Sequence, residues 1–238
     1  MLTWFPSPYP DELFYSVLCR YYLSSGIKEH NIVKRLLFGN RVGIKMATLY
    51  PNAAVHAVLS QLPEGVFDGH NVILHHTPFL YYTRMYPATE REALMDDLLQ
   101  GRSKTPTHLW RTFPKGDYAL RYCPLCVRED TQIYGEPYYH VEHQIPLSSV
   151  CVRHRCRLKQ IAVDNPRLAL NNRFYPLGTM GTDREPDMDV TPAELQVSEL
   201  VREYWRLPAS ISPPACNNLY QTLLNSGYMT IVRQNGLN

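Results

Sequence analysis

The sequence predicts a mostly helical protein with one short, cysteine-rich segment of β type near its middle. Apolar residues recur at helical spacing in several segments, whereas four of the six cysteines fall within residues 119–162, where helix signals are few. The 19 prolines indicate short elements joined by turns. With 45% hydrophobic and 19% charged residues, the chain of 238 residues is expected to be globular rather than disordered.

The N-terminal part is expected to form three short helices. The first extends from an N-cap at Asp11 to about Ser24 and ends before Gly26. The second covers residues 28–38 and the third residues 52–62. Two short helices joined by a turn are compatible with a helix-turn-helix, although the same pattern is common in helical domains that do not bind DNA.

Two further helical segments precede a basic connection. Residues 70–86 are apolar and aromatic and are expected to form a buried helix. Residues 88–100 are expected to form an amphipathic helix that opens at Thr89, with Glu92 at capping-box spacing. Residues 101–118 carry four cations and one acid and form the connecting stretch.

The C-terminal part begins with a loop-rich stretch over residues 163–190. A helix is expected over residues 191–206, because Pro192 suits the first helical position, and a last helix is expected over residues 216–225. We therefore predict a helical domain over residues 1–115, a cysteine-rich region over residues 116–162, and a C-terminal helical region over residues 163–238.

Two matched motifs carry the strongest chemical signal. Cys123-Pro-Leu-Cys126 is followed, after 24 residues, by Cys151-Val-Arg-His154. Two tight turns that each supply two ligands can hold a tetrahedral Zn²⁺ through thiolates and an imidazole. A thioredoxin-type C-x-x-C would not explain the second pair. We therefore predict a structural zinc ion, held by Cys123, Cys126, Cys151 and His154 in a small β zinc ribbon.

Other donors lie close to these motifs. His140 and His143 form an H-x-x-H pair between them, and Cys156 follows His154 by two residues, so any of these three could replace a ligand. We prefer the set with matching turns and expect His140 and His143 to pack or hydrogen-bond near the metal. Four protein ligands leave no open position for water, which argues against a metal-dependent hydrolase or nuclease.

No catalytic motif is found in the sequence. G-x-S-x-G, the Walker A motif, the dinucleotide fingerprint and H-E-x-x-H are all absent. Asp96 and Asp97 would point about 100° apart on a helix, so they would not converge on one metal site. Glu129 and Asp130 are expected to serve as turn or salt-bridge residues. The sequence thus predicts a binding protein without catalytic residues.

The case for nucleic-acid binding depends on local basic clusters, since 24 cations against 22 acids leave a net charge of only +2. One set surrounds the possible helix-turn-helix and comprises Lys28, Lys34, Arg35, Arg41 and Lys45. The other set follows the second motif and comprises Arg153, Arg155 and Arg157. Its alternation would place several cations on one face of a strand. That face could contact phosphates, or equally protect an edge strand from aggregation.

Two segments of the chain resemble the TnsD/TniQ family of bacterial transposon target-selection proteins. The first is Phe5-Pro-Ser-Pro-Tyr-Pro-Asp-Glu-Leu13, with Tyr15-Ser16 and Arg20-Tyr21 after it. The second is similar to the family's zinc-finger region and comprises Arg121-Tyr-Cys-Pro-Leu-Cys126, Glu129-Asp130, Tyr134-Gly135-Glu136, His143-Gln144-Ile145-Pro146, Cys151-Val-Arg-His154 and Leu158. The resemblance covers about residues 4–160. Val152 and Arg155 stand where the family usually has Pro and Gly.

The resemblance implies a non-catalytic adaptor in DNA transposition. Such proteins mark a target by binding a DNA site directly or by joining an RNA-guided CRISPR effector complex. They then recruit an AAA+ ATPase, which brings in the transposase. Carried over to this chain, the four predicted ligands hold zinc and the helix-turn-helix falls near residues 11–62. Trp4 and Phe5 would contact the ATPase or, alternatively, pack onto the core of their own domain.

Three rival hypotheses remain at this point. The chain could be a zinc-containing transcription regulator that binds DNA without an ATPase partner, a metal-dependent nuclease, or a structural subunit of a larger assembly. No apolar run approaches the roughly 18 residues of a membrane span, and the N-terminus lacks the basic region of a signal peptide. We expect a protein of the bacterial cytoplasm that associates with the nucleoid when it acts. The oligomeric state is open, with a homodimer as one option.

Overall fold

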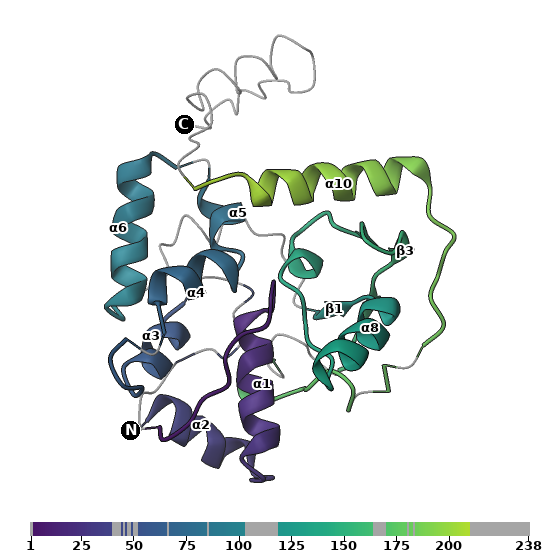
Figure 1. Cartoon of the computed structure of the whole chain (residues 1–238). Coiled ribbons are helices and arrows are strands. Elements are labelled where there is room, and N and C mark those ends of the chain that lie inside the picture. The colour runs from purple at the N-terminus through teal and green to yellow at the C-terminus, as the bar shows by residue number, and fades with distance from the viewer. Residues whose placement is uncertain are drawn as a thin grey trace, which may run out of the picture.

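The computed structural model describes residues 2–39, 44, 46, 49, 52–65, 67–84, 86–102, 119–163, 170–179, 181–182 and 184–209. This part of the chain is mostly helical and has two small two-stranded sheets in the cysteine-rich region, as the sequence predicted. Figure 1 shows the N-terminal helices on one side, the cysteine-rich region on the other, and a long helix that extends over both. None of the described helices is long and apolar enough to span a bilayer.

Helix α1 (Phe14–Ser24) is the central helix of the N-terminal part and buries the side chains from Phe14 to Cys19. The predicted N-cap at Asp11 is wrong, because the helix starts after Leu13 and no side chain caps it. Asp11 instead adopts a left-handed conformation with φ 58°. Its carboxylate faces away from the helix, toward His140 in the cysteine-rich region.

Helices α2 (His30–Phe38) and α3 (Ala54–Leu59) pack against each other and are shorter than predicted. The Asn52 side chain accepts the backbone N–H of Ala54, which fixes the start of α3. Four of the six residues of α3 are buried, so few of its side chains face outward. Most of the segment between the two helices lies outside the described residues, and the helix-turn-helix stays a prediction.

The single helix predicted over residues 70–86 is two helices, α4 (Gly69–His75) and α5 (Phe79–Thr83). The break falls at Pro78, which has no N–H to continue the helical ladder, and the Thr77 hydroxyl accepts the N–H of Phe79. Helix α6 (Ala88–Leu99) follows. The predicted cap at Thr89 is wrong, because the helix starts directly after Pro87 without a side-chain cap.

The cysteine-rich region contains one helix that the sequence analysis did not predict. Strand β1 (Arg121–Tyr122) leads into α8 (Pro124–Tyr134), a helix of 11 residues. Pro124 occupies its first position, and the Cys123 sulfur accepts the N–H of Cys126 as an N-cap. The expectation of a segment with few helical residues was therefore wrong between the two cysteine motifs.

The remaining elements of this region are short. The 3₁₀ helix η1 (Glu142–Gln144) precedes an antiparallel hairpin of β2 (Val150–Cys151) and β3 (Cys156–Arg157). Strand β4 (Lys159–Gln160) pairs back with β1. Residues 152–155 form the hairpin turn, so Arg153 and Arg155 do not lie on one strand with Arg157, contrary to the predicted stripe.

Helix α10 (Pro192–Arg206) confirms the helix predicted over residues 191–206 and starts with a capping box between Thr191 and Glu194. It packs on β2 at one end and on α5 at the other, and Figure 1 shows it extending across the molecule. The Ser198 hydroxyl accepts the N–H of Val150. The helix predicted over residues 216–225 lies outside the described residues.

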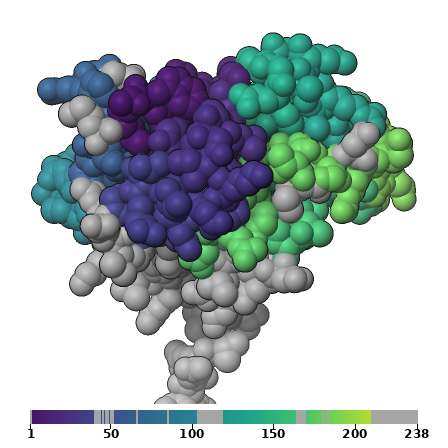
Figure 2. Space-filling model, turned by 90° about the horizontal axis from the view of Figure 1, so that it is seen from below, coloured from purple at the N-terminus to yellow at the C-terminus, as the bar shows by residue number. Residues whose placement is uncertain are grey.

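One hydrophobic core extends through all of these parts, from Leu2 in the N-terminal segment to Trp205 in α10. Residues of the stretch after the cysteine-rich region take part, since Phe174 stacks on Tyr22 of α1 with ring centroids 4.9 Å apart. Figure 2 shows this stretch, in green, against the purple α1 and α2. The cysteine-rich region thus shares a core with the N-terminal helices.

Candidate metal centre

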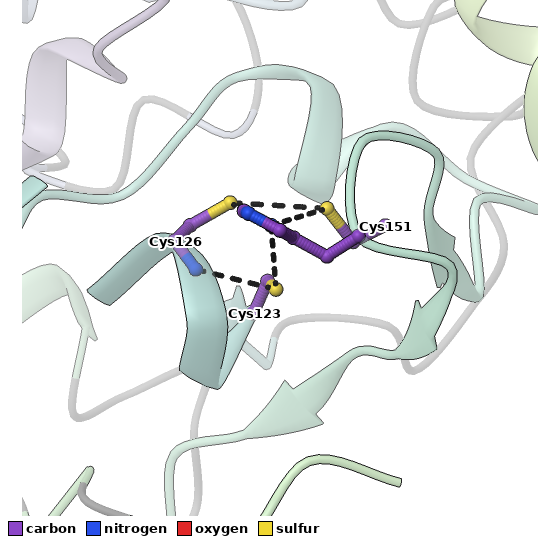
Figure 3. Close-up of side chains that lie close together, drawn as sticks. Cys123, Cys126 and Cys151 are labelled. Atoms are coloured by element: carbon purple, nitrogen blue, oxygen red, sulfur yellow. Dashed lines mark hydrogen bonds between the residues drawn. The ribbon is translucent and has the colours of Figure 1, made fainter. Parts of the chain in front are cut away.

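The structure brings the four predicted ligands together. The ligand atoms of Cys123, Cys126, Cys151 and His154 all lie within 4.8 Å of one another, and the three cysteines are buried. Figure 3 shows Cys123 and Cys126 at the start of α8 and Cys151 facing them from the hairpin. Residues far apart in the sequence therefore converge because one motif starts a helix and the other forms a tight hairpin turn.

Four of the six distances between the ligand atoms fit a tetrahedral zinc ion. Zinc–sulfur and zinc–nitrogen bonds of about 2.3 and 2.05 Å require ligand atoms about 3.8 Å apart for two sulfurs and about 3.6 Å apart for a sulfur and a nitrogen. The Sγ atoms of Cys126 and Cys151 are 3.8 Å apart. His154 Nδ1 lies 3.3, 3.5 and 3.6 Å from the sulfurs of Cys126, Cys123 and Cys151. The cluster could therefore hold a metal ion.

The thiols of the cluster strongly influence one another's ionisation. Hydrogen bonds from neighbouring thiols, above all Cys126, hold the pKa of Cys123 well below its usual range. A hydrogen bond with the Cys123 sulfur raises the pKa of Cys151 to about 12. Without a cation, one thiolate thus suppresses the ionisation of its neighbours, since like charges at this distance repel. A divalent ion would supply the positive charge that lets all the ligand thiols ionise.

Glu129 and Asp130, which the sequence suggested as turn or salt-bridge residues, both face histidines. Glu129 Oε2 lies 3.4 Å from His154 Nε2, on the side of the ring opposite the sulfurs. A carboxylate at this position orients a metal-binding imidazole so that Nδ1 faces the ion. Glu129 also forms an ion pair with Arg153. The sequence analysis placed Glu129 correctly in a salt bridge but missed its relation to His154.

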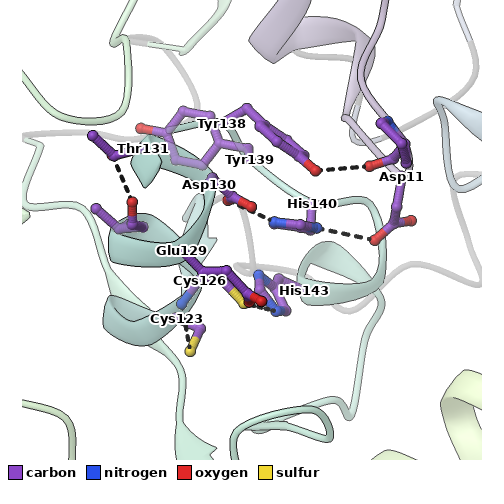
Figure 4. A network of polar contacts seen from close by, with 12 residues as sticks. Asp11, Cys123, Cys126, Glu129, Asp130, Thr131, Tyr138, Tyr139, His140 and His143 are labelled. Atoms are coloured by element: carbon purple, nitrogen blue, oxygen red, sulfur yellow. Dashed lines mark hydrogen bonds and ion pairs between the residues drawn. The ribbon is translucent and has the colours of Figure 1, made fainter. Parts of the chain in front are cut away.

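His140 and His143 lie beside the cluster, outside the four-atom group. His143 is buried, and its Nε2 is 4.0 Å from the sulfur of Cys126. Figure 4 shows His140 between Asp130 of α8 and Asp11 of the N-terminal segment. His140 Nε2 is 2.9 Å from Asp130, and its Nδ1 is 3.4 Å from Asp11. The two histidines therefore connect the candidate metal centre to the N-terminal helices.

The backbone strengthens the same junction. The N–H of Leu13 donates to the carbonyl of Tyr139, and the N–H of Val141 donates to the carbonyl of Asp11. Nearby, the Arg20 guanidinium pairs with the buried carboxylate of Glu12 at 2.9 Å. Burial raises the pKa of Glu12 to about 7, against the charge of Arg20, which lowers it. Polar groups thus bind the region of the metal centre to the start of α1.

Comparison with known proteins places these features in one family. The family model described as TniQ matches residues 3–158, which include α1, the junction and all four ligand residues. The chain belongs to the TniQ family. It is also 28% identical over 179 residues to the transposon Tn7 transposition protein TnsD of Escherichia coli, a match that covers 73% of this chain. The match spans 34% of that relative, so this TniQ chain corresponds to about a third of its length.

The basic residues that the sequence singled out in this TniQ chain have different surroundings. Arg153 pairs with Glu129, and Arg157 pairs with Glu194 of α10 at 2.9 Å. Lys34 Nζ donates to the side chain of Asn172 at 3.2 Å. The remaining described members of the two predicted sets are exposed: Lys28, Arg35 and Arg155. Arg41 and Lys45 lie outside the described residues.

The two aromatic residues of the N-terminal segment separate into different environments. Phe5 is buried and packs between Phe14, Tyr21 and Phe67. Trp4 is 54% exposed and stacks on one face of Tyr21. The packing alternative thus describes Phe5, whereas Trp4 presents a large apolar surface to the outside.

Proposed function

We propose that this chain is a non-catalytic target-selection adaptor in DNA transposition, built around a structural zinc ion. The observation that carries the proposal is the TniQ match over residues 3–158, which includes the converging ligands Cys123, Cys126, Cys151 and His154. In this proposal the chain marks a target, on DNA or within an RNA-guided effector complex. It then recruits an AAA+ ATPase that brings in the transposase.

The geometry of the metal centre supports a structural role for zinc. Three buried cysteines and one histidine fill a tetrahedral shell, and such closed sites leave no position for a reactive water. When bound, zinc would hold the start of α8 and the β2–β3 turn together. With these two elements held together, the binding surfaces of the protein would stay in fixed positions.

The distribution of cations supports a limited direct contact with DNA. Two cations of the hairpin, Arg153 and Arg157, are neutralised by acids of this chain. Lys28 and Arg35 at α2 are exposed and can face phosphates. With a net charge of +2 and few cations free to contact phosphates, we expect weak affinity for DNA that decreases only gradually as salt concentration rises.

Exposed apolar surface supports a protein partner. Trp4 is more than half exposed, while its neighbour Phe5 anchors the segment in the core. Tryptophan is enriched among the residues that dominate binding at protein interfaces. We propose that Trp4 contacts the AAA+ ATPase.

The decisive experiment is a pull-down of the AAA+ ATPase encoded beside this gene, with and without target DNA. We expect wild type to retain the ATPase, Cys123→Ser to lose both zinc and binding, and Trp4→Ala to lose binding while it keeps zinc. Ile133→Ala is the matched control, because Ile133 of α8 is a similarly exposed apolar side chain, at 61%. Binding of DNA without the ATPase under every condition would favour a transcription regulator instead.

A salt titration tests the DNA contact separately. We expect the double variant Lys28→Ala/Arg35→Ala to bind DNA more weakly, with a shallower dependence on salt, because it releases fewer counterions. Arg102→Ala is the control, since Arg102 is exposed but paired with Asp97 at 3.2 Å. Equal salt dependence in wild type and the double variant would show that α2 does not contact phosphates.

A further inference from the structure

Cys156 is a fourth cysteine sulfur at the candidate metal centre, and nothing in the four-ligand arrangement uses it. It is fully buried on β3, directly opposite Cys151 in the hairpin register. Its sulfur is not among the four ligand atoms that lie within 4.8 Å of one another. Its sulfur lies only 3.3 Å from the sulfur of Cys123. A ligand thiol and a non-ligand thiol are therefore in contact.

We propose that Cys123 and Cys156 form a redox pair that releases the metal when a peroxide oxidises it. The inference rests on the zinc assignment made above, and it adds a site of covalent modification to that centre. With zinc bound, Cys123 would be a thiolate and would accept the Cys156 S–H as a hydrogen bond. The same contact aligns the two sulfurs for a bond to each other.

The reaction proceeds in two balanced steps. The Cys123 thiolate attacks a peroxide oxygen, the O–O bond breaks, and the products are a Cys123 sulfenic acid and hydroxide. The Cys156 sulfur then displaces the hydroxyl group from Cys123 sulfur, which forms the disulfide, and the thiol proton leaves in water. The two sulfurs together lose two electrons, which reduce the peroxide. Cys126, Cys151 and His154 alone would then remain to hold a zinc ion, so the affinity of the site for zinc would decrease.

The geometry favours this pair over a disulfide between the ligands Cys126 and Cys151. The sulfurs of Cys126 and Cys151 are 3.8 Å apart, farther than the 3.3 Å between Cys123 and Cys156. A disulfide between Cys126 and Cys151 would remove two candidate metal ligands, whereas a disulfide between Cys123 and Cys156 would remove only one. Both sulfurs of the proposed pair are buried, so we expect a slow reaction. The side chain of His154, 3.5 Å from Cys123, is 20% exposed.

Hydrogen peroxide treatment of the zinc-loaded chain tests the proposal. A chromogenic chelator reports released zinc, peptide mapping under non-reducing conditions identifies the disulfide, and reduction followed by added zinc measures recovery. We expect wild type to release one zinc for each Cys123–Cys156 disulfide and to rebind it after reduction. Cys19→Ser is the matched control, because Cys19 is a buried thiol of α1, outside the cluster, and this variant should behave as wild type.

Cys156→Ser separates the possible outcomes. We expect this variant to bind zinc before treatment and to recover less zinc after reduction, because a Cys123 sulfenic acid that has lost its 3.3 Å thiol neighbour proceeds more readily to the sulfinic acid. Full recovery in Cys156→Ser, a wild-type disulfide at another pair, or no zinc release from wild type would each overturn the proposal. So would an inability of Cys156→Ser to bind zinc, which would make Cys156 a ligand. Disulfide mapping in wild type tests the pair even if the zinc assignment fails.

Discussion

At the scale of single residues, Arg155 shows how the hairpin turn departs from its family. It follows the candidate ligand His154 and has φ 51°, a left-handed backbone conformation that residues other than glycine rarely adopt. The TniQ resemblance places glycine at this position. The backbone has therefore kept the turn that glycine normally makes, although a long cationic side chain occupies the position.

We predict that Arg155→Gly stabilises the zinc-loaded protein by up to about 1 kcal/mol. Relief of the left-handed strain exceeds the extra entropy that glycine gains in the unfolded chain. Urea denaturation measures the free energy of unfolding. Arg155→Ala removes the same charge but keeps the Cβ, so it should show no gain. Equal stability of the two variants would mean that charge, and not backbone strain, explains the effect.

His140 is the residue whose protonation matters most at the junction. Burial alone would lower its pKa, but hydrogen bonds and charges of Asp11 and Asp130 raise it to about 10. The folded protein thus binds this proton more tightly than the unfolded chain, where histidine has a pKa near 6.5. The stabilisation is complete below pH 6.5 and is lost as the pH rises toward 10.

We predict that the difference in stability between wild type and His140→Asn decreases from pH 7 to pH 10. Measurements at saturating zinc should start at pH 7, because burial raises the pKa values of Asp11 and Glu12 to about 6 and 7. Thermal unfolding followed by circular dichroism gives the comparison. His70→Asn is the control, since the side chain of His70 is 62% exposed. A difference that stays constant with pH would show that His140 is neutral in the folded protein.

At the scale of elements, α10 and α8 show what the sequence can and cannot predict. The start of α10 was predictable, because Pro192 and the capping pair Thr191 and Glu194 are neighbours in the chain. The start of α8 was missed, because its cap is the sulfur of Cys123, which the sequence analysis considered only as a metal ligand. Cys123 is both a helix cap and a candidate metal ligand, and its C-x-x-C spacing indicates only the second role.

We predict that Thr191→Ala lowers the free energy of unfolding by about 1 kcal/mol. The substitution removes the hydroxyl that accepts the N–H of Glu194 and leaves the first turn of α10 without its cap. Thr131→Ala is the control, because Thr131 lies within α8, on its exposed side. Its hydroxyl donates to the carbonyl of Val127 and caps no helix. A loss equal to that of the control in chemical denaturation would show that the capping box contributes little.

At the scale of the whole molecule, the candidate metal centre and the N-terminal helices form one packed structure. The predicted boundary near residue 116 lies outside the described residues, so the division into domains stays a prediction. The cluster of Cys123, Cys126, Cys151 and His154 was predictable because the spacing within each of its two motifs is local. The links of Asp11 and Glu129 to histidines were not, because they depend on how distant segments pack.

We predict that removal of zinc by a chelator loosens α1 as well as the hairpin. The backbone N–H of Leu13 donates to the carbonyl of Tyr139, and the N–H of Val141 donates to the carbonyl of Asp11, so both depend on how the cysteine-rich region lies against the start of α1. Hydrogen exchange at these amides should accelerate when zinc is removed and slow again when it is restored. Unchanged exchange in α1, with faster exchange confined to residues 150–157, would show that the two parts unfold independently.

The N-terminal segment ahead of α1 has one more consequence. Its backbone pairs with residues 139–141, and its Tyr9 ring packs against Tyr134 and Tyr138. Many small zinc modules can be cut out and transplanted as self-contained parts. In this protein, the first 13 residues of the chain pack against the cysteine-rich region and complete its structure. A fusion protein that carries residues 119–162 alone should therefore misfold, and tags or truncations near the N-terminus should disturb metal binding more than those near α6.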